Sequence, residues 1–254
     1  GSTHQDLTQL VSDLNAGKIK LLIIDDSNPV YALPHSMGFL KAIKKAFVVS
    51  LASQKSETTH AANLVLPTLT AYESWGDAFP RAGVRSIQQP VMSTVNTFDA
   101  KAREDILLSA AQSANEKAFP RNSNYLDYLQ DVWSKIQREV GDERNFDSFW
   151  INVLENGGIF EQPKYIRTSL NRKVTSVKVN DPGMADRDGL TLLPTTSLLL
   201  GDGSGANKPW LQEVPNPMSQ IVWDSWMEIN PETAQKLGIN DRAIIEVTTP
   251  HGSV

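Results

Sequence analysis

Hydrophobic positions in the first third of the chain switch between helical spacing and short continuous runs. Spacings of three or four residues predict three helices, at 5–15, 36–46 and 57–62. Continuous apolar runs are typical of buried parallel strands and lie between those helices, at 20–25, 47–51 and 63–67. Short strands alternating with helices predict an α/β fold with a parallel, doubly wound sheet and right-handed crossovers.

The carboxyl ends of these predicted strands are where we expect a ligand crevice, because ligands of parallel sheets bind at that edge. Three loops emerge there, at 26–34, 53–58 and 68–89. The third is long, contains several Gly and Pro residues and has almost no hydrophobic periodicity. A loop of that length in a compact domain is usually functional or a packing arm.

In the rest of the chain, the sequence pattern first predicts a helical segment and then a β domain. Helical spacing predicts helices at 124–140 and 145–156, whereas 164–180 alternates weakly, as surface strands do. From residue 190 onward, strand and turn signals indicate a separate β domain, reached through a Gly-rich connection at 201–207. We therefore divide the chain into three parts: an α/β domain (1–118), a helical and irregular connecting segment (119–188) and the start of a β domain (189–254).

The last residues indicate a β unit that is interrupted. Residues 243–249 alternate like a half-buried strand, and 250–253 have the composition of a turn. We expect the chain to stop at Val254, where the return strand should begin, so that one hairpin arm lacks its partner.

Composition excludes several kinds of site. The net charge of −5 argues against nucleic acid as a partner, since phosphate binding needs clustered Lys and Arg. There is no cysteine, which excludes iron–sulfur clusters, thiolate zinc sites and disulfides within these 254 residues. The four histidines are scattered without metal-ligand spacing, so we expect no metal site. No apolar stretch approaches the roughly 18 residues of a membrane helix, and residues 1–14 lack the apolar core of a signal peptide.

Two groups of acidic residues are candidates for chemistry. Asp25 and Asp26 follow the first predicted strand and could form an acid pair, but a turn and helix-cap cluster is the interpretation we favour. Glu73 and Asp77 flank Trp75-Gly76 in the long loop and could bind a ribose or a metal. Here we favour loop capping.

Arginine and tryptophan side chains offer two further candidates. Arg81 and Arg85 could reach a phosphate, although solvated loop charges are the simpler interpretation. Trp210, Trp223 and Trp226 could stack on a cofactor, but tryptophans near a domain junction more often serve as packing or interface anchors.

Four stretches in the same order resemble motifs of the molybdopterin oxidoreductase family, which includes dimethyl sulfoxide reductase and formate dehydrogenase. They lie at 21–30, 57–67, 73–76 and 229–241. The resemblance implies a cofactor crevice lined by Asn28, Thr58 and Gly76. It also implies that 229–241 leads into a C-terminal β-barrel domain, so that 189–254 is the start of an incomplete β-barrel-type domain.

Within that family, three segments are similar to the large iron–sulfur subunit of alternative complex III, a quinol:electron-acceptor oxidoreductase. They are 73–77, 86–90 and 209–224. This likeness implies part of a membrane-bound respiratory complex whose partners are an integral membrane quinol subunit and cytochrome c subunits. It implies a peripheral position on the periplasmic side of the inner membrane, with iron–sulfur clusters elsewhere in the full subunit.

The stretch after Gly76 departs from the family's cofactor loop. Aligned on Gly76, the family's Asn, Glu and Arg fall on Pro80, Ala82 and Val84. Proline has no N–H, and Ala and Val side chains form no hydrogen bonds. We therefore expect a vestigial crevice, a doubtful role for molybdopterin, no catalytic residue, and a function in structure, assembly and electron-transfer scaffolding.

Two alternatives stay open at this point. In the first, the chain belongs to a catalytic molybdopterin enzyme of the polysulfide or thiosulfate reductase type, and the residues that resemble cofactor contacts line a real site. In the second, the chain is a nucleotide-binding module unrelated to either. The loop chemistry separates the first alternative from the leading hypothesis, because a cofactor-binding relative should keep polar donors where Pro80 and Ala82 stand.

Overall fold

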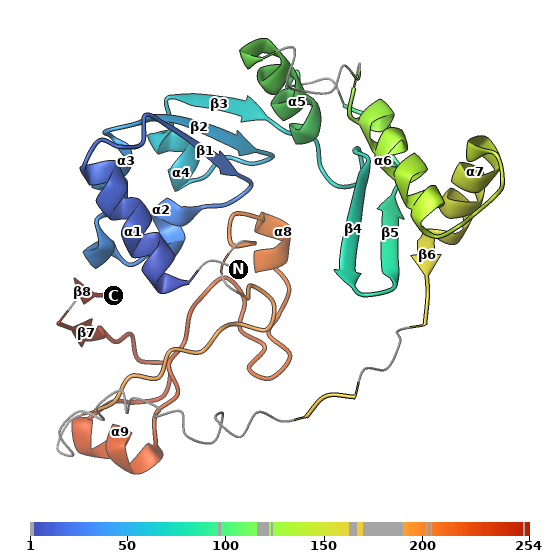
Figure 1. Cartoon of the computed structure of the whole chain (residues 1–254). Coiled ribbons are helices and arrows are strands. Elements are labelled where there is room, and N and C mark those ends of the chain that lie inside the picture. The colour runs from blue at the N-terminus through green and yellow to red at the C-terminus, as the bar shows by residue number, and fades with distance from the viewer. Residues whose placement is uncertain are drawn as a thin grey trace. The chain divides into compact units, whose positions relative to one another are not determined.

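A computed structural model of the chain describes residues 3–95, 98–115, 122, 124–162, 167–169, 190–201, 203, 205–250 and 252–254. The chain divides into two compact units (Figure 1), of which the first contains Gly1–Leu66 and Thr195–Val254 and the second Pro67–Pro194. The strands predicted at 164–180 lie almost entirely outside the described residues. The three-part domain division stays a prediction.

A parallel sheet forms the centre of the first unit. Its strands are β1 (Leu21–Asp25), β2 (Phe47–Ala52) and β3 (Leu64–Pro67), in the order β1-β2-β3. β1 and β2 are parallel and pair in register, from Leu21 beside Phe47 to Asp25 beside Leu51. The continuous apolar runs of the sequence therefore predicted these strands correctly, and the α/β class is confirmed.

The helices of this unit share one core with the sheet. They are α1 (His4–Asn15), α2 (Pro29–Ala32), η1 (a 3-10 turn, His35–Met37), α3 (Phe39–Ile43) and α4 (Glu57–Ala61). The core consists of the buried side chains of Val11, Leu14, Ile24, Phe39, Ala42, Ile43 and Val48. The helix predicted at 36–46 is interrupted at Gly38, whose φ of 69° ends η1 and begins α3.

The second unit contains an antiparallel sheet where the sequence predicted a long loop. Its strands are β4 (Gly76–Arg81), β5 (Val84–Gln88) and β6 (Gly158–Phe160), in the order β4-β5-β6. The loop prediction for 68–89 was therefore wrong over its second half. Pro80 is compatible with a strand because it lies in edge strand β4 at the register shift between Ala78 and Arg81, where it has no cross-strand partner.

Three helices accompany this sheet: α5 (Arg103–Ala114), α6 (Tyr125–Glu139) and α7 (Phe146–Asn156). The last two confirm the helices predicted at 124–140 and 145–156. Their apolar faces form a second core, whose buried members are Leu129, Trp133, Ile136, Phe149, Trp150 and Val153. Trp150 contacts Trp133 edge-on, with ring centroids 6.3 Å apart, and Trp75 at 6.1 Å.

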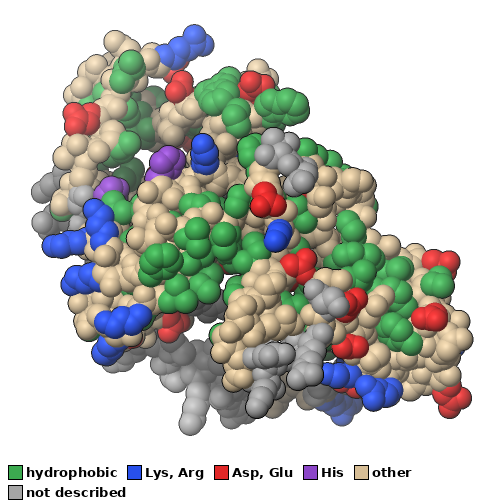
Figure 2. Space-filling view, turned by 90° about the horizontal axis from the view of Figure 1, so that it is seen from above, with side chains coloured by type: hydrophobic (Ala, Val, Ile, Leu, Met, Phe, Trp, Pro, Cys, Tyr) green, Lys and Arg blue, Asp and Glu red, His purple; other side chains and the backbone are tan. Residues whose placement is uncertain are grey.

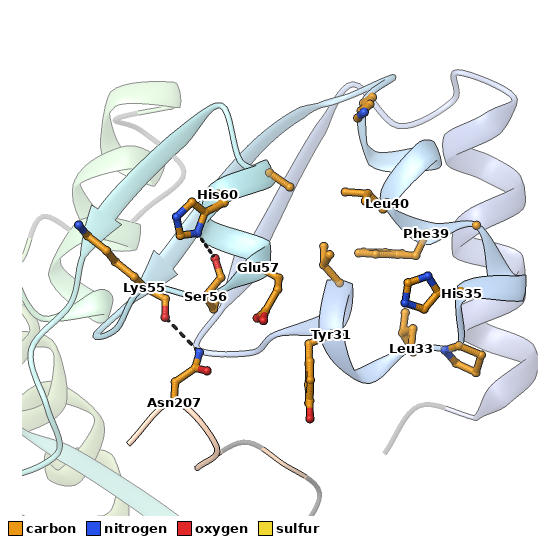
Figure 3. A pocket seen from close by; sticks show the side chains of 15 residues that line it. Tyr31, Leu33, His35, Phe39, Leu40, Lys55, Ser56, Glu57, His60 and Asn207 are labelled. Carbon is orange, nitrogen blue, oxygen red and sulfur yellow. Dashed lines mark hydrogen bonds between the residues drawn. The ribbon is translucent and has the colours of Figure 1, made fainter. Parts of the chain in front are cut away.

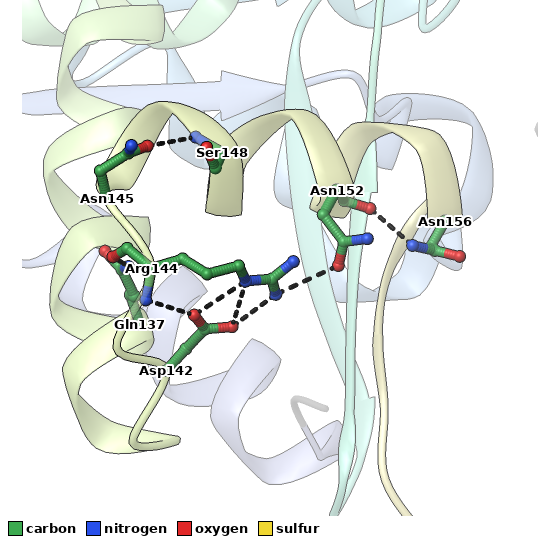
Figure 4. A network of polar contacts seen from close by, with 7 residues as sticks. All are labelled: Gln137, Asp142, Arg144, Asn145, Ser148, Asn152 and Asn156. Carbon is green, nitrogen blue, oxygen red and sulfur yellow. Dashed lines mark hydrogen bonds and ion pairs between the residues drawn. The ribbon is translucent and has the colours of Figure 1, made fainter.

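The corner between α6 and α7 is fixed by a polar network (Figure 4). The Arg144 Nε donates to Asp142 Oδ1 at 3.0 Å, and the Gln137 side chain donates to the Arg144 carbonyl at 2.6 Å. Asn145 then caps α7 by accepting from the Ser148 N–H at 2.8 Å. These bonds satisfy backbone groups that a tight helix–helix connection would otherwise leave unpaired.

The described part of 190–254 contains two helices and one short hairpin. They are α8 (Pro209–Gln212), α9 (Pro231–Leu237), and β7 (Thr248–Thr249) paired antiparallel with β8 (Gly252–Ser253). The return strand that we expected to be missing is therefore present, and Val247 and Val254 exchange backbone hydrogen bonds of 2.8 and 3.0 Å. No closed barrel forms among these described residues, and an incomplete barrel stays a prediction. Across the described chain, no helix has the length and apolar character that a membrane crossing requires.

Candidate functional site

Asn28 sits at the carboxyl end of β1, where its side chain joins two loops of the parallel sheet. It precedes Pro29 at the start of α2. Its Oδ1 accepts from the Thr58 N–H at 3.1 Å and from the Thr58 hydroxyl at 2.8 Å, and its Nδ2 donates to Glu57 Oε2 at 2.7 Å. A side-chain amide has two donor and two acceptor positions, so Asn28 uses three of its four within the protein.

Thr58 is the buried half of this pair. Its side chain is fully inaccessible to solvent, and its hydroxyl accepts from the Val30 N–H at 3.1 Å while donating to Asn28. The bond from Asn28 lowers the pKa of the Glu57 carboxyl, and a backbone N–H of Glu57 itself lowers it further. The structure therefore brings together two of the three predicted site residues, and it turns their polar groups toward each other.

A cavity of about 1070 Å³ lies beside this pair, at the edge of the sheet predicted to hold a crevice (Figure 3). Its apolar wall includes Leu33, Phe39 and Leu40. Asn207, from the C-terminal part of the same unit, reaches the rim and donates to the Lys55 carbonyl at 3.1 Å. Residues from distant parts of the sequence therefore line the same cavity.

The cavity is lined by two lysines and two imidazole side chains, and by one carboxylate. Lys44, Lys55, His35 and His60 line it, against the single carboxylate of Glu57. The His60 Nδ1 lies 2.7 Å from the Ser56 carbonyl oxygen, which can only accept, so Nδ1 carries the proton in this contact. This arrangement suits an anionic group better than a cation.

Gly76, the third predicted site residue, lies in the second unit, where it begins β4 and pairs with Gln88 of β5. The positions where the family's cofactor donors would fall are part of the same hairpin. Val84 is buried and pairs with Phe160 of β6, and Arg81 pairs with Val84 across the turn. Gly83 has a φ of 79°, which this turn requires.

Asp77 has a role that the sequence did not indicate. Its Oδ2 accepts from the indole N–H of Trp133 at 3.2 Å, which links the hairpin to α6. Burial raises the pKa of the Asp77 carboxyl, and the indole hydrogen bond opposes that rise in part. Burial, together with the charge of Asp77, raises the pKa of Tyr125 to about 12. The only sequence signal was Trp133 itself, since a buried indole needs an acceptor.

Among the other acidic candidates, Glu73 behaves as a structural group. Glu73 Oε2 accepts from the Thr70 N–H at 3.1 Å and from its hydroxyl at 2.8 Å, so it caps a loop as we favoured. Asp26 has a φ of 40° at the turn after β1. Among the residues that the structure describes, no three His, Asp or Glu side chains are grouped to hold a metal ion.

Of the arginine and tryptophan candidates, Arg85 makes contacts within the protein, whereas the three tryptophans are exposed. Arg85 forms an ion pair with Glu139 at 3.0 Å and lies over the Phe79 ring at 5.8 Å, so it is not simply a solvated loop charge. Trp210, Trp223 and Trp226 are 85%, 57% and 41% exposed. None of the three is buried in a core of the described residues.

Comparison with known proteins finds two similar relatives, although no protein-family model matches the sequence. One is the menaquinone reductase, molybdopterin-binding-like subunit of Nitratidesulfovibrio vulgaris, 23% identical over 259 residues and 99% of this chain. The other is the assimilatory nitrate reductase catalytic subunit of Bacillus subtilis, 22% identical over 266 residues and 97% of this chain. The chain spans 35% and 36% of their lengths. Both support the coarse resemblance to molybdopterin oxidoreductases.

Proposed function

We propose that this chain is part of a large subunit of a membrane-bound respiratory quinol:electron-acceptor oxidoreductase of the alternative complex III type. In this proposal it is a molybdoenzyme-like domain without molybdopterin, and it serves structure, assembly and electron-transfer scaffolding. The partners would be an integral membrane quinol subunit and cytochrome c subunits. A relative named as a menaquinone reductase subunit supports membership of a quinone-linked complex.

The observation that carries this proposal is the closed hydrogen-bond pattern of Asn28 and Thr58. A cofactor contact needs donors and acceptors that are free to face the ligand. The Asn28 side chain already uses three of its four hydrogen-bonding positions in bonds to Thr58 and Glu57. Thr58 has no accessible surface. Opening either residue toward a ligand would break bonds that hold two loops together, so the pair fits a structural role better than a cofactor contact.

The hairpin of the second unit supports the same proposal. Pro80 offers no N–H, and the side chains of Ala82 and Val84 offer no hydrogen-bonding atom. Val84 is also buried, within strand β5. As a set, these residues do not fit the guanosine or pyrophosphate of a molybdopterin dinucleotide, and we derive no redox step through that group.

One observation favours a second candidate function. The cavity beside Asn28 is large and carries Lys44, Lys55, His35 and His60, which would suit a phosphate-bearing cofactor. This is the arrangement that a catalytic molybdopterin enzyme of the polysulfide or thiosulfate reductase type would need. A relative named as a nitrate reductase catalytic subunit is compatible with it.

Native purification tests the assembly part of the proposal. The protein, tagged at its natural locus, is extracted from membranes with mild detergent, and the co-purifying polypeptides and c-type haem are identified. We expect an integral membrane subunit, cytochrome c and iron–sulfur signals in one complex that reduces an acceptor with quinol. A protein that purifies alone, or with only a soluble reductase partner, would contradict the proposal.

A further inference from the structure

Three tryptophans of the second unit contact one another in a row. Trp75 lies just before β4, Trp150 belongs to α7 and Trp133 belongs to α6. The ring centroids of Trp75 and Trp150 are 6.1 Å apart, and those of Trp150 and Trp133 are 6.3 Å apart. Both spacings are those of aromatic rings in direct contact. We call these three side chains the tryptophan row.

The row becomes more deeply buried from one end to the other. Trp75 is partly buried, Trp150 is 8% exposed and Trp133 is fully buried. The surface at the end of the molecule where α7 lies mixes hydrophobic and acidic side chains (Figure 2), whereas the two inner tryptophans pack among apolar side chains of the second core. In such a dry interior, little water has to reorient when charge moves from one ring to the next.

The inner end of the row has a proton acceptor. The indole N–H of Trp133 donates to Asp77 Oδ2 at 3.2 Å, which is within reach for proton transfer between two positioned groups. Burial raises the pKa of the Asp77 carboxyl, and this makes its carboxylate a stronger base. Asp77 also lines a cavity of about 390 Å³ together with Arg103, Glu104 and Tyr125. Water in that cavity could return a proton that Asp77 has taken.

Core packing explains the ring contacts but not the choice of a carboxylate. A backbone carbonyl would satisfy a buried indole N–H without the cost of burying a charge. The indole ring is among the side chains that lose one electron most readily, and the chain has no cysteine that would be oxidised first. Loss of an electron makes the indole N–H strongly acidic. A carboxylate that already accepts this N–H is then placed to take its proton.

From these contacts we propose that the tryptophan row is a one-electron relay, which takes an oxidising equivalent from a high-potential one-electron oxidant and holds it at Trp133. The oxidant removes one electron from Trp75, which is refilled from Trp150 and that in turn from Trp133. The N–H bond of Trp133 breaks, its proton binds to Asp77 Oδ2, and a neutral indole radical remains. The oxidant has gained one electron and Asp77 one proton. The inference does not rest on the proposed function, because all four side chains belong to the second unit.

Photo-oxidation of the full-length polypeptide tests the relay. Tyr72, which is 67% exposed and three positions before Trp75, is replaced by p-azidophenylalanine, and a ruthenium polypyridyl photo-oxidant is coupled to the azide. A light flash with an electron acceptor in solution produces the one-electron oxidant. Transient absorption and freeze-quenched electron paramagnetic resonance follow the radical, and indole-deuterated tryptophan distinguishes it from a tyrosine radical.

Four variants locate the radical and its proton. Trp133→Phe identifies the signal of the inner tryptophan. Trp150→Phe interrupts the row with a ring that is not oxidised, and Asp77→Asn keeps an acceptor for the indole N–H but removes the base. Phe146→Leu is the matched control, since Phe146 stacks on Trp150 with ring centroids 5.9 Å apart but is not part of the row. Urea unfolding of each variant checks that it is folded.

We expect a neutral tryptophan radical in the parent protein, lost in Trp133→Phe and in Trp150→Phe and retained in Phe146→Leu. In Asp77→Asn the signal should be that of the protonated radical cation. A neutral Trp133 signal that survives Trp150→Phe or Asp77→Asn would overturn the proposal. A tyrosine radical in the parent, or no tryptophan radical there, would overturn it without reference to any variant.

Discussion

The carboxyl-edge loops of the first unit and the β4–β5 hairpin of the second unit both resemble cofactor-contacting segments, but they differ in what remains. The loops keep their polar residues, Asn28 and Thr58, and use them to bind each other. The hairpin keeps Gly76 but has Pro80 and Val84 where polar donors would be expected, and its two antiparallel strands shift register between Ala78 and Arg81. The loop segment therefore keeps residue types that resemble the family's, whereas the hairpin does not.

This difference teaches that a motif can persist for structural reasons. Asn28 begins α2 and connects it to the start of α4, so replacing it would cost stability whether or not a ligand is bound. Among the described residues, no comparable side-chain bond network depends on Pro80 and Ala82. Substitution at these two positions would therefore leave the described side-chain hydrogen bonds intact.

The largest effect is expected in the core beneath the hairpin. Trp133 is fully buried, and its indole N–H is bonded to Asp77, so Trp133→Ala removes both a large apolar group and a buried hydrogen bond. We expect the free energy of unfolding to fall by about 3–5 kcal/mol, measured by urea denaturation. Trp210→Ala, at an exposed tryptophan, should change it by less than about 0.5 kcal/mol. Equal losses in the two variants would contradict the core described for this unit.

The next effect tests whether Asn28 is structural. Asn28→Ala leaves the Thr58 N–H and hydroxyl without their acceptor, which should lower the free energy of unfolding by about 1–3 kcal/mol. Asn15→Ala, at an exposed asparagine that ends α1, is the control and should change stability by less than about 0.5 kcal/mol. If Asn28→Ala leaves the free energy of unfolding unchanged in thermal and urea denaturation, the hydrogen bonds between Asn28 and Thr58 do not stabilise the fold as described.

A smaller effect separates backbone strain from crowding in the hairpin. Gly83 has a φ of 79°, and a Cβ there would meet the Glu161 carbonyl oxygen at 2.8 Å. Gly141 has a φ of 70° with nothing within 4 Å of such a Cβ. We expect Gly141→Ala to cost about 1–2 kcal/mol from strain alone, and Gly83→Ala to cost more than its control. A Gly83→Ala variant as stable as Gly141→Ala would show that the turn adapts without cost.

The smallest effect is a pH dependence with opposite signs at two carboxyl groups. The raised pKa of Asp77 means that its contribution to stability is present below the unfolded value of 3.8 and is lost as pH rises through the folded pKa. Asp77→Asn should therefore gain stability relative to the parent protein as pH rises from about 3 to 7.

Glu73 provides the opposite case. Hydrogen bonds from Thr70 lower the pKa of Glu73, so its contribution is present above the unfolded value of 4.5 and is lost as pH falls through the folded pKa. Glu73→Gln should be less stable than the parent at neutral pH, and the difference should shrink in acid. Unfolding curves at several pH values measure both trends, and the same sign for the two variants would contradict the assignments.

Local sequence patterns predicted the regular elements around the crevice but not the contacts between distant segments. The apolar runs located β1, β2 and β3 because a strand buried in a parallel sheet needs apolar side chains over its whole length. The β4–β5 hairpin was missed because Pro80 and Gly83 are signals of a loop. Gly83 lies in the turn between the strands, and Pro80 is tolerated because β4 is an edge strand.

The site could be anticipated only in part, for a related reason. Asn28 and Thr58 both follow strands of one parallel sheet, so their proximity follows from the fold class. The contact between Asp77 and Trp133 joins residues 56 positions apart, and no local pattern specifies that pairing. The orientation of the Asn28 amide toward Thr58 also depends on side-chain packing rather than on spacing.

Cofactor content of the purified subunit tests the central proposal, that the crevice at Asn28 and Thr58 does not hold molybdopterin. Molybdenum and iron are measured by elemental analysis of the native complex, and the oxidised fluorescent derivative of the pterin is assayed in the same sample. The account predicts iron without molybdenum or pterin above the background of a mock purification. One molybdenum and its pterin per subunit, lost on substitution of Lys44 or Lys55 at the cavity, would contradict it.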